Sequence, residues 1–193
     1  MTTPSRHFTP EQRVELLSIA RRAIRECVCG RSDSPPAPVD PTLRAPGAAF
    51  VTLTQRGSLR GCIGYVHAIR PLADAIAHCA ASAATGDPRF PPVTASELSD
   101  IQIEISVLSP LRPASDPGEI QVGVHGLHIS KGAHHGLLLP QVASEHGWDR
   151  ETFLRQVCVK AGLPQDAWRR GADLQVFTVE RIEDGLPVGM DDL

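Results

Sequence analysis

The sequence lacks the features that would assign a protein to a membrane, to export or to nucleic acid. No stretch of its 193 residues approaches the roughly 20 apolar residues that a membrane helix needs. Residues 1–10 are polar and lack the apolar core of a secretory signal. The formal net charge of −3 gives no general attraction to phosphate backbones. We therefore expect a soluble, cytoplasmic protein that binds neither membranes nor nucleic acid.

The sequence also lacks the short motifs of several enzyme classes. It contains no glycine-rich phosphate loop after a strand, no G-x-S-x-G nucleophile elbow and no H-E-x-x-H helix. If they lie on strands, the histidine pairs His125/His128 and His134/His135 direct their rings to opposite faces, which makes a poor chelate. We expect no metal site and no cofactor.

Disulfide spacing is missing as well. The five cysteines are an odd number and show neither the paired spacing of a disulfide framework nor that of a zinc site. Cys79 and Cys158 fall on the inward faces of predicted helices, whereas Cys27 and Cys29 form an isolated C-x-C pair at a helix end. Cys62 alone lies in a strand pattern, so each cysteine has to be judged separately.

Helical and alternating periodicities predict an α+β fold, with an antiparallel or mixed sheet covered by helices. A capping box of Thr9 and Gln12 opens the first helix, and Gly30 ends it. Its predicted inward face carries Val14, Leu17, Ala20, Ile24 and Cys27. Further helices are predicted over residues 71–85, 140–147 and 149–162, and strands over 48–54, 59–64, 101–107, 120–124, 127–130 and 174–179.

One domain is expected, spanning residues 10–183. A chain of this length can bury one substantial core, whereas two full-sized domains would leave both cores thin. Residues 1–9 and 184–193 are tails in this interpretation. Residues 31–47 contain five prolines and form an extended loop within the domain.

The hexapeptide Leu59–Gly64 is the candidate chemical centre. On a regular strand its odd-numbered residues point to the core and its even-numbered residues to the opposite face. Arg60 and Cys62 then lie about 7 Å apart at their Cα atoms, close enough for the guanidinium to favour a thiolate. Gly61 and Gly64 leave the backbone bare, which permits close approach of a ligand. The alternative is that Cys62 is a small buried hydrophobe and that the glycines only ease packing against the alanine-rich helix.

Other residues are candidates for the same site. Asp87 and Arg89 follow a helix in a proline-rich loop and could form a binding wall, with helix termination and a structural ion pair as the alternative. Glu104 could project from its strand into a polar cleft, with a salt bridge to Arg60 as the alternative. His67 is the best histidine candidate for a base, with an exposed loop residue as the alternative.

Four further blocks follow the hexapeptide in order: Asp87–Pro92, Glu104–Leu108, Gly136–Val142 and Trp148–Leu163. Together with the hexapeptide they resemble the AMMECR domain family over residues 10–183. The resemblance implies an α+β fold with a main lobe and a smaller lobe. Bacterial and archaeal members of the family resemble protein A of the three-part AmmeMemoRadiSam system, and the resemblance implies the same role for this chain. The partners would be a Memo-like, dioxygenase-related protein and a radical SAM protein.

One departure from the family pattern affects its interpretation. An arginine often precedes the Gly136 block in the family, whereas this chain has His134-His135. If that arginine binds an anion in relatives, the same role is in doubt here.

Two hypotheses follow for function. In the first, the chain is an enzyme component that uses Cys62 as a thiolate nucleophile or as an acyl or alkyl acceptor. In the second, it is a non-catalytic binding module that docks one of the partners through the face of Leu59–Gly64. Candidate substrate-binding residues in the first hypothesis are Arg60, Gly61, Gly64, Asp87, Arg89 and Glu104.

Overall fold

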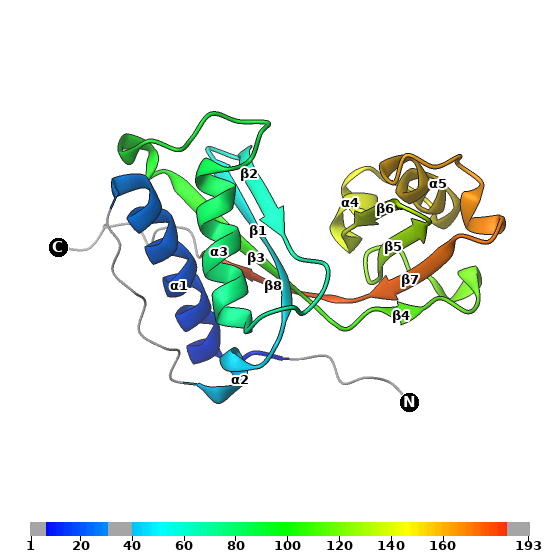
Figure 1. Ribbon diagram of the computed structural model, residues 1–193, viewed down its shortest axis with the longest axis horizontal. Coiled ribbons are helices and arrows are strands. Elements are labelled where there is room, and N and C mark those ends of the chain that lie inside the picture. Colours follow the sequence, from blue (N-terminus) through cyan, green and yellow to red (C-terminus); the bar gives the residue numbers. More distant parts are fainter. Residues whose placement is uncertain (1–6, 31–39, 185–193) are drawn as a thin grey trace. The chain divides into compact units, whose positions relative to one another are not determined.

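The computed structural model describes residues 7–30 and 40–184, which fold into two compact units (Figure 1). Among these residues the first unit contains 7–107 and 181–184, and the second contains 108–180. The chain therefore leaves the first unit at the end of one strand and re-enters it within another. Each unit has a buried apolar cluster of its own.

The first unit is built on a four-stranded sheet in the order β2–β1–β3–β8. Its strands are β1 (Ala48–Gln55), β2 (Ser58–Gly64), β3 (Ile101–Leu108) and β8 (Val179–Glu183). β1 and β2, both predicted as strands, form an antiparallel hairpin. Its turn residues Arg56 and Gly57 have φ of 51° and 78°, the left-handed geometry that matches the twist of the flanking strands.

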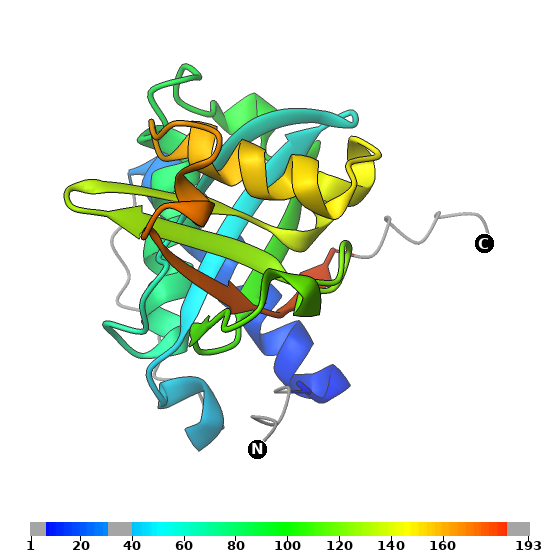
Figure 2. The same ribbon diagram turned by 90° about the vertical axis from the view of Figure 1, so that its right-hand side faces the viewer.

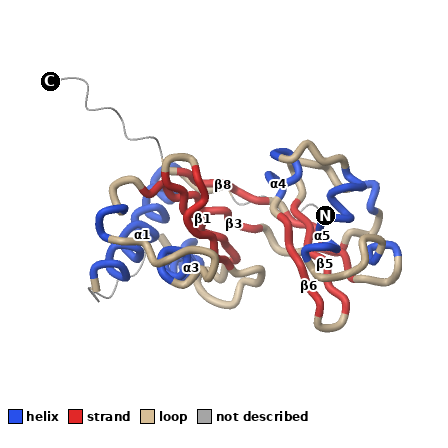
Figure 3. Tube along the Cα trace, turned by 90° about the horizontal axis from the view of Figure 1, so that it is seen from above, coloured by secondary structure: helices blue, strands red, loops and turns tan. Residues whose placement is uncertain are grey.

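Two helices, α1 (Pro10–Cys29) and α3 (Leu72–Thr85), lie on one face of this sheet (Figures 1 and 3). α3 contacts β1 and β2, and α1 packs along α3. Eight of the fourteen residues of α3 are buried. Most of these side chains are small, which allows the helix to pack closely. The opposite face of the sheet carries the even-numbered, mostly polar residues of β1 and β3.

The inward face of α1 differs from the predicted one at both ends. Its buried residues are Leu16, Ile19, Ala20 and Ile24, whereas Val14 is 67% exposed. Val14 is exposed because it lies on the far side of the helix from this buried stripe. Cys27 is exposed because it lies level with Thr85, where α3 ends, and its Sγ is 3.2 Å from Thr85 Oγ1.

Short elements connect the main ones in the first unit. α2 (Pro41–Arg44) is capped by the side chain of Asp40, so the prediction of an uninterrupted loop over residues 31–47 is wrong at this point. Residues 31–39 of that predicted loop lie outside the described residues. η1 (Ala95–Glu97) begins at a capping box of Thr94 and Glu97.

The second unit contains an antiparallel sheet in the order β4–β7–β5–β6. Its strands are β4 (Arg112–Pro113), β5 (Gly126–Lys131), β6 (His134–Leu138) and β7 (Asp173–Phe177). The longer helix, α5 (Arg150–Lys160), lies along this sheet and buries Phe153 and Val157 (Figure 2). The remaining elements are α4 (Pro140–Glu145), η2 (Pro117–Glu119) and η3 (Ala167–Arg169).

The α+β class predicted from the sequence is confirmed, with two four-stranded antiparallel sheets and covering helices. The predicted strand at 120–124 is wrong. The amides of Val124 and His125 donate to the carbonyl of Gln121, and Gly123 has a φ of 82°, so this segment is a turn. Within residues 7–30 and 40–184, no helix has the length and hydropathy of a membrane span.

Candidate functional site

β2 is the outer strand of the first sheet, and its register with β1 changes within the hexapeptide. Leu53 lies opposite Gly61, but the next residue, Thr54, lies opposite Leu59, so Arg60 is the extra residue of a β-bulge. Residues directly opposite each other in antiparallel strands share a face. Leu59 therefore shares the polar face of Thr54, and the prediction that Leu59 points to the core is wrong. Its exposed fraction is 43%.

The two glycines of the hexapeptide are required by packing within the first unit. A Cβ atom on Gly61 would overlap the carbonyl group of Ala83 on α3, so only glycine lets the helix approach the strand. A Cβ atom on Gly64 would overlap the ring of Phe50 on β1. The space beside each glycine is thus filled by another part of the fold. Gly61 packs against the alanine-rich helix, as the alternative predicts, whereas Gly64 packs against β1.

Arg60 is held at the outer edge of β2 by four hydrogen bonds. Its Nε and Nη2 donate to the carboxylate of Glu97 at 2.8 and 3.2 Å. Its Nη1 and Nη2 donate to the carbonyls of Pro91 and Pro92 at 2.7 and 3.1 Å. The bonds from Arg60 are the main reason that the pKa of Glu97 falls to about 2. This guanidinium is therefore committed to the loop that follows α3.

Asp87 and Arg89 bind the backbone of Cys62 rather than an open cavity. The amide of Cys62 donates to Asp87 Oδ2 at 2.9 Å, and Arg89 Nη2 donates to the carbonyl of Cys62 at 3.3 Å. Arg89 also donates to both oxygens of Asp87. Asp87 is only 4% exposed, and these bonds hold its pKa far below its usual range. The ion pair closes an edge that would otherwise present unpaired backbone groups.

Unlike its backbone, which binds Asp87 and Arg89 at the strand edge, the side chain of Cys62 lies on the polar face of the sheet. Cys62 is half-buried and lies directly opposite Thr52 of β1. The hydroxyl of Thr52 donates to the sulfur at 3.2 Å. The sulfur therefore accepts a hydrogen bond from the neighbouring strand.

The polar face continues onto β3 and β8. Ser106 Oγ donates to Glu104 at 3.2 Å, and Arg181 donates to Glu104 at 2.6 Å and to Glu183 at 2.5 Å. The alternative prediction of a salt bridge between Glu104 and Arg60 is therefore wrong. Glu104 does share a sheet face with Cys62, although β1 lies between their strands. Two further polar residues on this face, Thr54 and Gln102, are joined by a hydrogen bond of 3.5 Å.

The other cysteines divide by exposure. Cys79 and Cys158 are buried as predicted, whereas Cys27 and Cys29 are exposed. Burial raises the pKa of Cys79 to about 11 and also raises the pKa of Cys158. Both buried thiols therefore stay protonated at neutral pH.

The histidines are dispersed among different partners. Gln121 N donates to His125 Nδ1, whereas His128 Nδ1 is 3.0 Å from Gln175 Oε1. His67 lies on the exposed loop after β2. In the described part of the chain, no group of three or more histidine, cysteine or acidic side chains is arranged to hold a metal ion.

Sequence reasoning missed the partners that define the site. Glu97 closes a capping box with Thr94, and this local pattern does not reveal that Glu97 also binds Arg60. The position of Thr52 on the polar face of β1 could have been predicted, because polar residues alternate with apolar ones along this strand. The role of Arg181 had no signal, because β8 was not predicted.

Comparison with known proteins places these residues in a family. The AMMECR1 family pattern matches residues 17–182. A protein of Methanothermobacter thermautotrophicus is 50% identical over 160 residues, which cover 79% of this chain and 83% of that protein. A protein of Thermococcus onnurineus is 49% identical over 187 residues, covering 90% and 91%. The crystal structure of the uncharacterised protein PH0010 from Pyrococcus horikoshii is 41% identical, covers 90% and 92%, and superposes with a TM-score of 0.84. The chain belongs to the AMMECR1 family.

Proposed function

We propose that the chain is an enzyme component in which the Cys62 thiol acts as a nucleophile or as the acceptor of an acyl or alkyl group. One observation carries this proposal. The arginine and both glycines of the hexapeptide are engaged in packing or pairing, whereas the cysteine sulfur is half-buried on a polar face with a hydroxyl donor beside it. The side chain of Cys62 is thus available for chemistry, because neither packing nor ion pairing uses it.

The surrounding residues take roles that differ from the predicted ones. Asp87 and Arg89 act as positioning residues, because they fix the amide and the carbonyl of Cys62. Arg60 positions the strand edge through Glu97. Thr52 stabilises the thiolate through its hydroxyl. Among the predicted substrate contacts, Glu104 remains the candidate, because it shares the face of the sulfur.

The reaction follows from thiolate chemistry. The thiol proton passes to solvent, and the thiolate sulfur attacks the electrophilic carbon of an acyl or alkyl donor. A sulfur–carbon bond forms while the bond to the leaving group breaks, and the leaving group departs with the electron pair. A later acceptor can then take the group from Cys62.

The resemblance of the hexapeptide to the AMMECR signature supports a place in the AmmeMemoRadiSam system. We propose that the chain acts there with a Memo-like protein and a radical SAM protein. Exposed free thiols at Cys27 and Cys29 suit a reducing compartment, and we therefore propose the cytoplasm as the place of action.

A binding module is the second candidate, favoured by one specific observation. Leu59 is 43% exposed on the outer strand, next to the bulge at Arg60. An exposed apolar side chain beside a fixed strand edge gives a partner protein one apolar contact. In this alternative the Leu59–Gly64 face binds a Memo-like or radical SAM partner, and the sulfur takes no part in chemistry.

Alkylation of Cys62 distinguishes the two. Iodoacetamide is applied to the Cys27→Ser/Cys29→Ser variant, and the rate at Cys62 is followed from pH 5 to pH 9 by peptide mass spectrometry. The enzyme hypothesis predicts faster alkylation at pH 7 than that of a free cysteine peptide. Inertness of Cys62 in the folded chain contradicts it. Loss of pathway function in Cys62→Ser with unchanged partner binding contradicts the binding module.

A further inference from the structure

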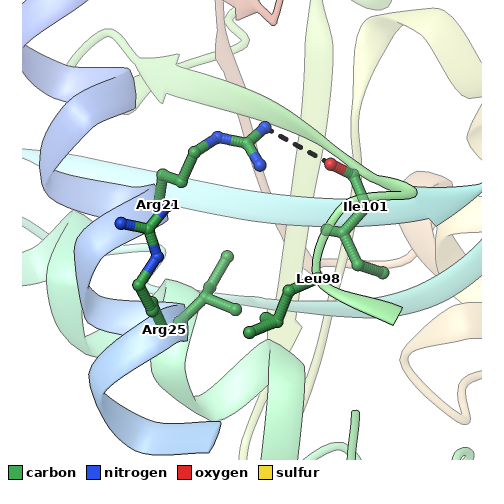
Figure 4. Close-up of a pocket in the computed structure, with 5 residues that line it drawn as sticks. Arg21, Arg25, Leu98 and Ile101 are labelled. Carbon is green, nitrogen blue, oxygen red and sulfur yellow. Dashed lines mark hydrogen bonds between the residues drawn. The ribbon is translucent and has the colours of Figure 1, made fainter. Parts of the chain in front are cut away.

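A pocket away from the hexapeptide lies between α1 and the segment that leads into β3 (Figure 4). Ile24 and Ile101 are each 3% exposed and form its apolar floor, and Leu98 adds to the wall. Arg21 and Arg25 line the rest of it. The volume is about 20 Å³, which is room for one water-sized group. The pocket shares no residue with the site around Cys62.

The two arginines crowd positive charge at this pocket. They lie four residues apart on α1, on adjacent turns, where like charges repel each other. Burial lowers the pKa of Arg21, and the positive charge of Arg25 lowers it further. The side chain of Arg25 turns along the helix toward Arg21 (Figure 4). The geometry therefore places two cations beside the buried side chains of Ile24 and Ile101.

The hydrogen bonds of Arg21 leave donors unused. Nη2 donates to the carbonyl of Ile101 at 3.3 Å and to the carboxylate of Asp184. Nε and Nη1 make no hydrogen bond within the described residues. Arg25 has neither an ion pair nor a hydrogen bond within residues 7–30 and 40–184. Within residues 7–30 and 40–184, two guanidinium groups thus face the single carboxylate of Asp184, an excess of one positive charge.

The nearest acidic residues along the chain are committed elsewhere. Glu97 and Asp100 flank Leu98 but pair with Arg60 and Arg56. Glu26, the residue after Arg25, pairs with Arg22 at 3.8 Å. The charge at the pocket is thus balanced neither by the loop nor by the helix.

We propose that this pocket binds the phosphate group of a small ligand between Arg21 and Arg25. Arginine matches the oxygens of a phosphate through paired N–H donors. One phosphate oxygen fits the pocket, and the others stay at its mouth within reach of both guanidinium groups. The apolar wall at Leu98 gives a contact for the organic part of a phosphate monoester. Such a site is independent of the chemistry proposed for Cys62.

Isothermal titration of the full chain with inorganic phosphate, methyl phosphate and acetate at matched ionic strength tests the proposal. Phosphate binding is expected to exceed acetate binding, and Arg25→Gln should weaken it about tenfold. Arg22→Gln removes the same charge from the neighbouring position and should change affinity less than about twofold. Tighter binding of methyl phosphate identifies an ester as the source of the group, and equal binding identifies free phosphate.

Asp184→Asn provides a test of opposite sign. Removing this carboxylate releases Arg21, so phosphate affinity should rise about threefold or more. Equal losses in Arg25→Gln and Arg22→Gln overturn the proposal, since the attraction would then be a general charge effect. Absence of phosphate binding by the natural chain at millimolar concentration overturns it as well.

Discussion

The outer edge of β2 and the polar face of the same sheet use charged and polar side chains in different ways. At the edge, Arg60 and Asp87 are each bound by a counter-ion and by backbone groups. On the face, Cys62 is half-buried and accepts one bond from a hydroxyl. Arg60 and Cys62, two residues apart, thus have different roles. Arg60 fixes the edge of β2, and Cys62 places its sulfur on the polar face.

The largest expected effect is at the edge. Asp87→Ala leaves the amide of Cys62 and the guanidinium of Arg89 without their buried acceptor, and should cost about 3 kcal/mol in the free energy of unfolding. Urea unfolding measures it. Asp74→Ala, at an exposed acid of α3, is the control and should cost less than about 1 kcal/mol. Equal costs contradict the role of Asp87 in closing the edge.

A methyl group at Gly61 should have the next largest effect. Gly61→Ala pushes the strand against the backbone of Ala83 and should cost about 2 kcal/mol. Gly64→Ala meets a ring instead, and the side chain of Phe50 can turn away, so its cost should be smaller. The two variants are compared by thermal and urea unfolding. A larger cost at Gly64 contradicts the packing described for β2 and α3.

The ion pair of Glu97 makes stability depend on pH. Its pKa is about 2 in the folded chain and about 4.3 when unfolded. A lowered pKa contributes stability above the unfolded value, and this stability is lost as pH falls from about 4.3 through 2. Natural chain and Glu97→Gln should therefore differ by about 1 kcal/mol at pH 7 and converge toward pH 2. A difference that is constant from pH 6 to pH 2.5 contradicts this.

The smallest effect on stability is expected on the polar face. Thr52→Val removes the donor to Cys62 with little change in volume, so unfolding should shift by less than about 1 kcal/mol. The rate of Cys62 alkylation at pH 7 should fall about fivefold, the worth of one hydrogen bond to the thiolate. Thr52→Ser keeps the hydroxyl and should retain the rate. An unchanged rate in Thr52→Val removes the proposed role of Thr52.

Local signals explain what could be predicted from the sequence. The capping box at Thr9, the end of the first helix at Gly30 and the apolar alternation of β3 depend on neighbours in the chain, and the structure contains all three. The α+β class follows from them. The prediction of a strand at 120–124 was wrong because it also used only local alternation. Alternation over five residues does not exclude the turn at Gly123.

Long-range pairing explains what could not be predicted. The bulge at Arg60 depends on register with β1, and register depends on packing across the whole sheet. The bulge moved Leu59 to the polar face. The partner of Arg60 lies 37 residues along the chain, and that of Glu104 lies 77 residues along, so no local pattern identifies either pair.

The central claim is that Cys62 is the residue of the hexapeptide that the fold does not need. The free energy of unfolding of Cys62→Ser, measured in urea beside that of Arg60→Gln, tests it most directly. Arg60→Gln should cost about 2 kcal/mol, because it leaves Glu97 and two carbonyls without their donor. Cys62→Ser should cost less than about 1 kcal/mol. A cost for Cys62→Ser as large as that for Arg60→Gln would make Cys62 a structural residue and contradict the account.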